Sequence, residues 1–283
     1  MNAVLNFAVM GNPIKHSYSP LLHTLFAQQA GISISYEKIL VPLDQFRETV
    51  NAFFKEGGKG LNITVPFKLQ AYELAANALS VRARAAGSVN TLWTENDLIH
   101  GCNTDGVGLL NDIKRLGYSP KGKKILLLGS GGAARGALLP LLESGCQQLM
   151  VANRTPAKAI ELVTHIGNAF PAYASVLSAG GFDEIQGRWD IIINATASSL
   201  QQDRLPLPTG LFSTESLAYD MVYNAENNTP FLQQARNDGA RLTSDGLGML
   251  VYQGAESFFI WNQIRVEPQP VLDTLRKQLQ TGQ

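Results

Sequence analysis

Several features that would place a protein in a specialised class are scarce or missing in this sequence of 283 residues. Cysteine occurs twice and histidine four times, without the paired spacing of a structural metal site. The formal net charge is +0 and no five-residue window is dominated by Lys and Arg. We therefore expect neither nucleic acid nor an acidic membrane surface as a partner. An apolar run of about 18 residues is also missing, which excludes a transmembrane helix.

The remaining composition is that of an ordinary globular protein. The start of the chain, MNAVLNFAVMGNPIKHS, lacks a basic segment followed by a long apolar core, so we expect no secretory signal peptide. Cys102 and Cys146 form no C-x-x-C motif and are expected to be reduced thiols. The length favours two domains, and 45% hydrophobic residues suffice for their cores. We predict a soluble, cytoplasmic protein, with a monomer and a homodimer both open.

The most informative stretch lies at residues 124–158. An apolar run, Ile125 to Leu128, ends in a glycine turn, and a helix-like segment then leads to a second apolar run, Leu149 to Ala152. The turn fits G-x-G-x-x-[GA] and comprises Gly129, Ser130, Gly131, Gly132, Ala133 and Ala134, followed by Arg135. This order predicts a dinucleotide-binding unit, because such glycines let the backbone approach a pyrophosphate at the N–H donors of a helix N-terminus. The alternative is a glycine turn in an unrelated α/β fold.

The end of the second predicted strand indicates which dinucleotide binds. An NAD site usually has Asp or Glu there, whereas this chain has Asn153, Arg154 and Thr155, with Lys158 one turn further on. A carboxylate would repel a 2′-phosphate, but a guanidinium can pair with it through two hydrogen bonds. The sequence therefore predicts NADP as the cofactor, unless Arg154 is merely a solvated loop residue.

The rest of the chain predicts an α/β fold with two α/β domains. Strands are expected at residues 7–10, 36–41, 60–65, 189–194, 217–222 and 240–243, a hairpin at 88–93 and 98–102, and helices at 20–30, 44–55, 105–117 and 229–238. Apolar residues at helical spacing predict two terminal helices, which return to the first domain. We predict an N-terminal substrate domain with a mainly parallel sheet (1–106 plus 244–283) and a Rossmann-type NADP-binding domain (107–243), with the site in the cleft between them.

A lysine near the start of a predicted helix is the first candidate for chemistry. In the run Asn62-Ile63-Thr64-Val65-Pro66-Phe67-Lys68, Pro66 is expected at the first helical position, which places Lys68 in the first turn. A cation there lies at the positive end of the helix dipole and costs about 0.3–1 kcal/mol, so folding alone would disfavour it. Lys68 is therefore a candidate for proton transfer. The alternative is an exposed lysine whose stem extends away from the helix.

Other polar residues have a structural as well as a functional interpretation. Ser17 and Ser19 lie on one side of an extended segment and could bind a carboxylate, although Ser19 is also placed to cap the next helix. Asp105 could cap a helix or act as an acid–base partner of Lys68. Asn90 could stabilise a turn, and Gln253 could be a buried amide within an apolar helix.

Taken together, these segments resemble the shikimate dehydrogenase family over nearly the whole chain and in order. The matching segments are 16–20, 62–68, 87–91, 103–106, 129–135, 153–155, 219–223 and 245–253. The resemblance implies reversible, NADPH-dependent reduction of 3-dehydroshikimate to shikimate in aromatic amino-acid biosynthesis.

The resemblance also implies a role for each candidate residue. Ser17 and Ser19 would hold the substrate carboxylate, and Lys68 and Asp105 would form the catalytic pair. The residues implied to position the ring hydroxyls are Thr64, Asn90 and Gln253. Those implied at the pyrophosphate and the adenosine phosphate are Gly129 to Arg135, Asn153, Arg154 and Thr155. Those implied beside the nicotinamide are Met221, Tyr223, Gly246 and Met249.

One segment departs from the family pattern. The run Asn194-Ala195-Thr196-Ala197-Ser198-Ser199-Leu200 begins like the family's N-A-T-S-x-G loop but lacks its glycine. Two other functions remain as alternatives. One is a quinate/shikimate dehydrogenase that uses NAD, against which Arg154 and the paired serines argue. The other is a non-catalytic NADP-sensing module, against which the presence of both Lys68 and Asp105 argues.

Overall fold

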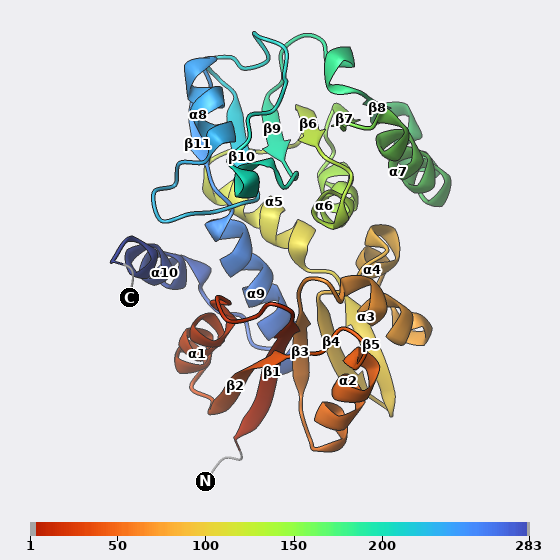
Figure 1. Ribbon diagram of the computed structural model, residues 1–283, viewed down its shortest axis with the longest axis vertical. Coiled ribbons are helices and arrows are strands. Elements are labelled where there is room, and N and C mark those ends of the chain that lie inside the picture. Colours follow the sequence, from red (N-terminus) through yellow and green to blue (C-terminus); the bar gives the residue numbers. More distant parts are fainter. Residues whose placement is uncertain (1–3, 282–283) are drawn as a thin grey trace.

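Two α/β domains face each other in the computed structural model, which describes residues 4–281 (Figure 1). The ends of the predicted substrate domain, residues 1–3 and 282–283, lie outside the described residues. In Figure 1 the N-terminal domain lies below and the glycine-turn domain above. Among residues 4–281, none of the helices is both long and apolar enough to cross a membrane.

The N-terminal domain is built on a mixed sheet of order β2-β1-β3-β4-β5. Its elements are β1 (Leu5–Gly11), α1 (Ser19–Ala30), β2 (Ile34–Leu40), α2 (Phe46–Lys55), β3 (Gly60–Ile63), α3 (Lys68–Leu74), α4 (Val81–Ala86), β4 (Thr91–Glu95) and β5 (Leu98–Cys102). β1 pairs in parallel with β2 and β3, whereas β3, β4 and β5 pair antiparallel. The antiparallel β4–β5 pair confirms the predicted hairpin, whose turn holds Asn96 and Asp97 at positive φ.

The second domain is a parallel sheet of order β11-β10-β9-β6-β7-β8. Its elements are α5 (Asp105–Arg115), β6 (Lys124–Leu128), α6 (Gly132–Glu143), β7 (Gln148–Ala152), α7 (Pro156–Ala169), β8 (Leu177–Gly180), β9 (Ile191–Asn194), β10 (Leu217–Asp220), α8 (Pro230–Asn237) and β11 (Leu242–Ser244). The strands are buried on both faces, as expected for a parallel sheet covered by helices.

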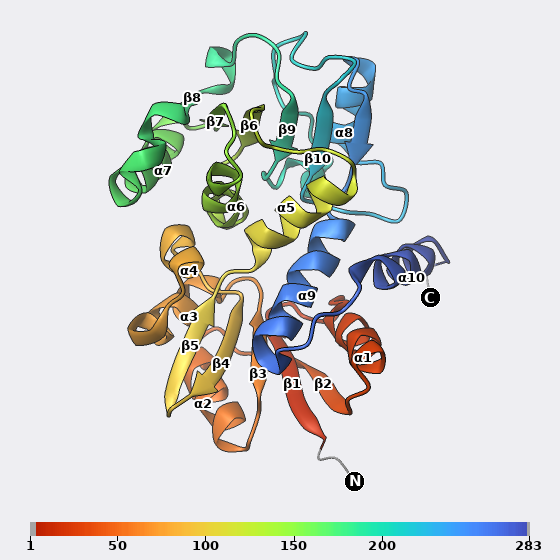
Figure 2. The same cartoon turned by 180° about the vertical axis from the view of Figure 1, so that it is seen from behind.

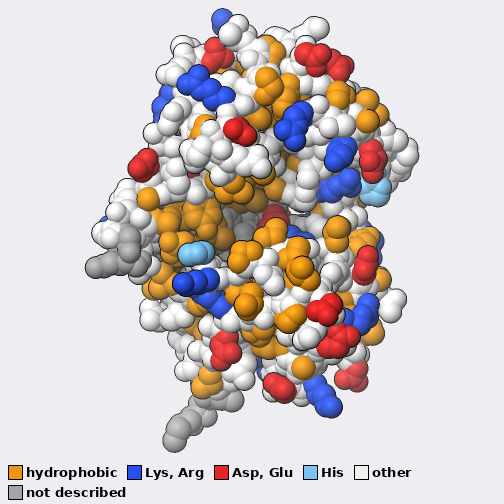
Figure 3. Space-filling model, in the orientation of Figure 1, with side chains coloured by type: hydrophobic (Ala, Val, Ile, Leu, Met, Phe, Trp, Pro, Cys, Tyr) orange, Lys and Arg blue, Asp and Glu red, His pale blue; other side chains and the backbone are white. Residues whose placement is uncertain are grey.

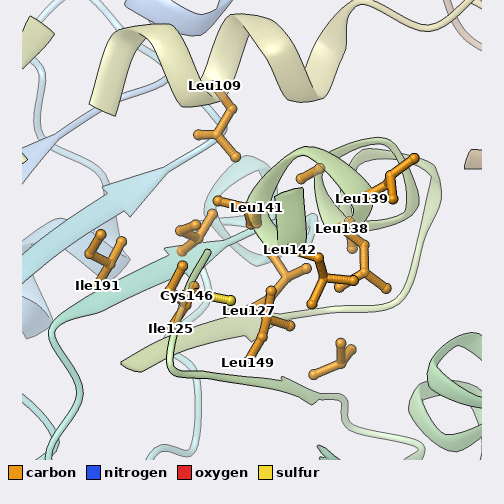
Figure 4. Close-up of a cluster of buried hydrophobic side chains, with 14 of the residues drawn as sticks. Leu109, Ile125, Leu127, Leu138, Leu139, Leu141, Leu142, Cys146, Leu149 and Ile191 are labelled. Carbon is orange, nitrogen blue, oxygen red and sulfur yellow. The ribbon is translucent and has the colours of Figure 1, made fainter. Parts of the chain in front are cut away.

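The core of this domain follows from the alternation of side chains along each strand. Leu127 and Leu149 point to the face covered by α6, where they meet Leu138 and Leu142 (Figure 4). Their neighbours Leu126 and Met150 belong to the opposite cluster, which includes residues of α8. Because β6 and β7 are buried on both faces, their register in the sheet is fixed. This register sets the positions of the glycine turn after β6 and of Asn153 after β7.

The C-terminal helices return to the N-terminal domain, as predicted. After the second sheet, α9 (Leu247–Asn262) runs back between the domains and α10 (Pro268–Thr281) lies beside it (Figure 2). Val251 and Phe258 of α9 and Leu275 of α10 form a buried cluster with Leu22 and Phe26 of α1. α5 passes close to α9, and a Cβ at Gly108 would lie 2.6 Å from the Gln253 backbone nitrogen. This close approach brings the start of α5 toward Gln253.

The structure corrects several local expectations. Val65–Pro66 is a cis peptide bond within a turn, so Pro66 precedes α3 and Lys68 itself is its first residue. The short elements α4 and β8 were not predicted. α4 is six residues long and depends on Ser80, whose hydroxyl accepts the Ala83 N–H at 3.1 Å. Such short segments carry too few residues for a periodic signal.

Candidate active site

The surface is hollowed between the two domains (Figure 3). One cavity of about 370 Å³ is lined by residues of both domains, and a second, of about 880 Å³, lies against the glycine turn. The loops after β9 and β10 lie between the two cavities. Ala195 lines the second cavity, Met221 lines the first, and the Met221 N–H donates to the Asn194 carbonyl at 2.9 Å. The cavities therefore occupy the carboxyl ends of the strands, where ligands bind in open α/β sheets.

Lys68 and Asp105 meet in the smaller cavity. The Lys68 Nζ donates to Asp105 Oδ2 at 2.6 Å, and the side chains are 28% and 10% exposed. Asp105 is the first residue of α5 and not its cap, because Thr104 occupies the cap position. Its backbone N–H is accepted by Asn103 Oδ1 at 3.1 Å. The carboxylate is therefore free to hold the ammonium at the mouth of the cleft while the loop before α5 fixes its backbone.

Asn90 connects this ion pair to the floor of the cavity. Its Nδ2 lies 2.8 Å from Asp105 Oδ1, 2.9 Å from Thr104 Oγ1 and 3.3 Å from Gln253 Oε1. Its Oδ1 accepts the Thr104 N–H at 2.9 Å. Asn90 and Gln253 therefore belong to one hydrogen-bond network, and both line the cavity. Asn90 contacts Asp105 directly and Gln253 reaches it through Asn90, and a network of this kind holds its members in one geometry.

The two serines converge in the same cavity. The Ser17 hydroxyl lies 3.1 Å from that of Ser19, and it also accepts the Ser19 N–H at 3.3 Å. Ser19 is the first residue of α1 rather than its cap, a position that Tyr18 occupies, so the capping interpretation was wrong. Ser17 also has a structural role, because its hydroxyl accepts the Ser19 N–H. Thr64 also lines this cavity.

Beside Ser19 lies an aromatic pair in which His23 is buried and Tyr36 is half-buried. Tyr36 donates to Asn62 Oδ1 at 2.7 Å and also hydrogen-bonds Ser19, and its ring stacks on His23 at 4.5 Å. Burial lowers the pKa of His23 to about 3, which keeps the ring neutral despite a bond to Asn62 that favours its charged form. Burial likewise raises the pKa of Tyr36 well above its usual value. Neutral, fixed groups thus support the floor of the cavity.

The residues expected beside the nicotinamide line the same smaller cavity. They are Met221, Tyr223, Gly246 and Met249. Gly246 packs directly on the Met221 carbonyl, which leaves no room for a Cβ. Burial, with lesser contributions from Tyr18 and Asp245, raises the pKa of Tyr223 to about 12, so its hydroxyl remains protonated.

The larger cavity collects most residues expected at the pyrophosphate and adenosine. Those that line it are Gly129, Ser130, Gly131, Arg135, Asn153, Arg154, Thr155 and Lys158. Gly132, Ala133 and Ala134 instead form the first turn of α6 behind it, and Ala134 is buried. A Cβ at Gly131 would meet no atom of the described residues within 4 Å, so the backbone is open to an approaching group. Exposed N–H groups at a helix start, flanked by cations, fit a phosphorylated dinucleotide.

The loop that departs from the family pattern is fixed by a buried carboxylate. Ser199, at the position of the family's glycine, lies in a short 3₁₀ helix (Ser198–Gln201) and donates to Asp220 Oδ2 at 2.5 Å. Asp220 also accepts from Thr229 Oγ1 at 2.5 Å and from Asn194 Nδ2 at 3.1 Å. Burial raises the pKa of Asp220, although these hydrogen bonds oppose the shift. Serine therefore replaces glycine with a hydroxyl that holds this loop against β10.

Sequence reasoning missed several residues that line the cavities. Asn62, in the smaller cavity, lies two residues before Thr64, and this strand spacing on one face was an available signal. Arg204 and Asp203 line the larger cavity together with the residues that follow β7. They follow the irregular loop after β9, where no periodicity or motif marks a residue as facing a ligand.

Three family models match the chain in the order of its domains. A shikimate dehydrogenase substrate binding domain matches residues 9–92, shikimate / quinate 5-dehydrogenase matches residues 113–202, and a shikimate 5'-dehydrogenase C-terminal domain matches residues 246–276.

Individual relatives match over nearly the whole length. A shikimate dehydrogenase (NADP(+)) of Bordetella avium (strain 197N) is 56% identical over 98% of this chain and 97% of the relative. Among solved structures, an Ael1 enzyme from Pseudomonas putida is 44% identical, with a TM-score of 0.89 and coverage of 96% of this chain and 98% of the other. Shikimate 5-dehydrogenase from Thermus thermophilus, in complex with NADP(H) and shikimate, is 32% identical, with a TM-score of 0.85 and coverage of 98% and 100%.

Proposed function

The chain belongs to the shikimate dehydrogenase family, and on that premise and the geometry of its cleft we propose the reaction it performs and the residues that perform it. It is an NADP-dependent oxidoreductase that interconverts 3-dehydroshikimate and shikimate. The observation that carries the assignment of the site is the 2.6 Å ion pair between Lys68 and Asp105, in a cavity that also contains Ser17, Ser19 and Gln253.

Lys68 moves the proton in this proposal. NADPH, when bound, supplies the hydride that reduces the ketone. The Lys68 ammonium donates a proton from Nζ to the carbonyl oxygen, and in the reverse direction the amine accepts it from the hydroxyl. Asp105 Oδ2 orients Nζ, while Asn90 occupies Oδ1 and keeps the carboxylate from rotating.

The substrate is bound by neutral hydrogen-bonding groups. The hydroxyls of Ser17 and Ser19 bind its carboxylate, and their convergence at 3.1 Å supports this role. Thr64, Asn90 and Gln253 position the ring hydroxyls. A site fitted by two serines leaves little room for the additional hydroxyl that quinate carries beside its carboxylate.

The cofactor is divided between the two cavities. The glycine turn, Gly129 to Arg135, binds the pyrophosphate through the start of α6. Asn153, Arg154, Thr155 and Lys158 bind the adenosine phosphate, and the side chains that line the nicotinamide are Met221, Tyr223, Gly246 and Met249. We accordingly assign residues 1–106 and 244–283 to the substrate domain and 107–243 to the cofactor domain.

Location and assembly are a separate part of the proposal. We place the protein in the cytoplasm, which the two buried, free thiols of Cys102 and Cys146 support. We expect a monomer or a homodimer, and light scattering of the purified protein would distinguish them.

A steady-state assay tests the function directly. The purified protein is given shikimate or quinate with NADP or NAD, and reduced cofactor is followed by absorbance. We expect turnover of shikimate with NADP, a preference for NADP over NAD of about 10–1,000-fold in kcat/KM, and poor use of quinate. Equal use of NAD, or comparable kcat/KM for quinate and shikimate, would favour the quinate/shikimate alternative. No turnover with any pair would favour the non-catalytic one.

A further inference from the structure

An ion pair between a partly exposed arginine and a buried carboxylate connects the C-terminal helix to the loops beside the active site. Asp245 lies between β11 and α9, and its side chain is fully buried. Arg276 of α10 reaches it with both terminal nitrogens: Nη1 donates to Oδ2 at 2.8 Å, and Nη2 donates to Oδ1. A carboxylate held by two parallel guanidinium bonds is fixed in orientation as well as position.

The same two side chains also hydrogen-bond the backbone of residues that directly follow two of the residues assigned to the nicotinamide. Asp245 Oδ2 accepts the Asn224 N–H at 3.3 Å, and Oδ1 accepts the Leu247 N–H at 3.3 Å. Arg276 Nη1 also donates to the Asn224 carbonyl at 3.0 Å. Asn224 directly follows Tyr223, and Leu247 directly follows Gly246. The pair thus joins the loop after β10 to the start of α9.

This junction lies beside the part of the cavity assigned to the nicotinamide. The Gly246 N–H donates to the Val222 carbonyl at 3.2 Å, which is a further hydrogen bond between the loop after β10 and the start of α9. Neither Asp245 nor Arg276 lines either cavity, so neither contacts a ligand there. Bonds that end on Asp245 nevertheless contribute to the spacing of Tyr223 from Gly246, because they hold the residue that follows each of them.

We propose that Arg276 and Asp245 are positioning residues that hold the nicotinamide side of the cleft in its working geometry from outside the site. This inference rests on the proposed function, because it takes Tyr223, Gly246 and Met249 as the nicotinamide contacts. It assigns the C-terminal helix a role in the reaction beyond packing. Small errors in the placement of reacting groups can cost as much as about 100-fold in rate.

Binding of cofactor fragments separates this role from general stability. In Arg276→Gln we expect the Kd for NADPH, measured without substrate, to rise about 10-fold, and kcat for shikimate oxidation to fall about 10-fold. The Kd for 2′,5′-ADP, which lacks the nicotinamide, should stay within about 2-fold, because the adenosine cavity has no contact with the pair. Asp245→Asn should act in the same direction. The double variant should be no worse than the more severe single variant, since the two residues act as a unit.

The chain offers a matched control at the opposite end of α9. Arg265 donates to Glu256 at 3.0 Å, so Arg265→Gln also removes a cation from a pair with a carboxylate near α9, but away from the cofactor. It should leave both Kd values and kcat within about 2-fold. Arg276→Lys keeps a cation near Asp245 and covers the case in which Arg276→Gln does not fold; its effects should be intermediate.

The outcomes distinguish failure of this inference from failure of the proposed function. Parallel changes in the Kd values for NADPH and 2′,5′-ADP, or additive effects in the double variant, would overturn the positioning role. So would unchanged NADPH affinity and kcat in variants whose urea midpoint has fallen. Absence of shikimate oxidation by the unmodified protein would instead contradict the proposed function, while the two Kd measurements would still test the junction.

Discussion

The two ends of the cleft are built in different ways. At the substrate end, Lys68, Asp105, Asn90 and Gln253 are linked by side-chain hydrogen bonds of 2.6–3.3 Å, and Asp105 and Asn90 are buried. At the adenosine end, Arg154, Lys158 and Arg204 are exposed and make no side-chain hydrogen bond or ion pair within residues 4–281. The Arg135–Glu161 pair there is 3.9 Å long.

The fixed side chains at one end and the exposed cations at the other suit the different roles proposed for the two ends. Proton and hydride transfer depend on geometry, so the groups that perform them gain from being fixed before the substrate arrives. A phosphate is a strong, long-range anion, and mobile cations can gather on it when it binds. We therefore expect substitutions at the substrate end to lower turnover, and those at the adenosine end to weaken cofactor binding.

The largest effect is expected at the ion pair. Lys68→Ala should lower kcat about 10²–10⁴-fold, since it removes the proposed proton donor. Asp105→Asn should cost somewhat less, because the amide can still accept a bond from Lys68. The double variant should be scarcely worse than Lys68→Ala, because residues that act as a unit do not contribute additively. Steady-state kinetics with saturating NADP and shikimate measure all three.

Cofactor affinity provides the control for this prediction. The Kd for 2′,5′-ADP should be unchanged in the three variants, since neither residue lines the larger cavity. If Lys68 were only a solvated cation, its loss would leave kcat intact and stability within about 1 kcal/mol. Near-normal turnover in Lys68→Ala would end the catalytic assignment.

The two ends were also predictable from the sequence to different degrees. The glycine turn and Asn153–Thr155 carry a strong local signal, because backbone close approach and charge choice restrict residue types at fixed positions. Lys68 and Asp105 were singled out, but their contact joins residues 37 positions apart, which local patterns do not encode. Arg204 lies on a loop whose path depends on Ser199 and Asp220, so its place in the cavity follows from tertiary structure alone. The start of α3 was misplaced because nothing local distinguishes a proline in a turn from one that opens a helix.

The second prediction concerns the choice of cofactor. Arg154→Ala should lower kcat/KM for NADP about 10–100-fold, mainly through KM, with little change for NAD. Arg204→Gln should act in the same direction but more weakly, because Arg204 is a second exposed cation that lines the same cavity. The measurement is kcat/KM with each cofactor at saturating shikimate. A fall in kcat that exceeds the rise in KM would contradict the expectation that the adenosine end acts on cofactor binding and the substrate end on turnover.

The third prediction is a pH dependence of stability at the substrate end. The pKa of His23 is lowered to about 3 in the folded protein, from an ordinary value of 6.5. Between these values the unfolded chain binds a proton that the folded chain does not, so stability falls as pH drops below 6.5. From this group alone, the free energy of unfolding should be about 2 kcal/mol lower at pH 5 than at pH 8.

Urea unfolding at both pH values tests this dependence. His23→Gln removes the titrating ring but keeps an amide that can donate to Asn62. Its loss of stability between pH 8 and pH 5 should be smaller than that of the unmodified protein by about 2 kcal/mol. An identical loss in the two proteins would show that His23 is not responsible.

The smallest effect is expected at Ser199, where the adenosine end has a buried network of its own. Ser199→Ala removes the hydroxyl that donates to Asp220 Oδ2 at 2.5 Å, while Thr229 and Asn194 continue to donate to that carboxylate. Because these other donors remain, the free energy of unfolding should fall by only about 1–2 kcal/mol. The loop that carries Ala195 to Ser198 along the larger cavity should loosen, so KM for NADP should rise about 2–3-fold with kcat retained. Urea unfolding and steady-state kinetics measure the two effects. A change in KM for shikimate instead would mean that the loop acts on the substrate end, and that the two ends are not as separate as their construction indicates.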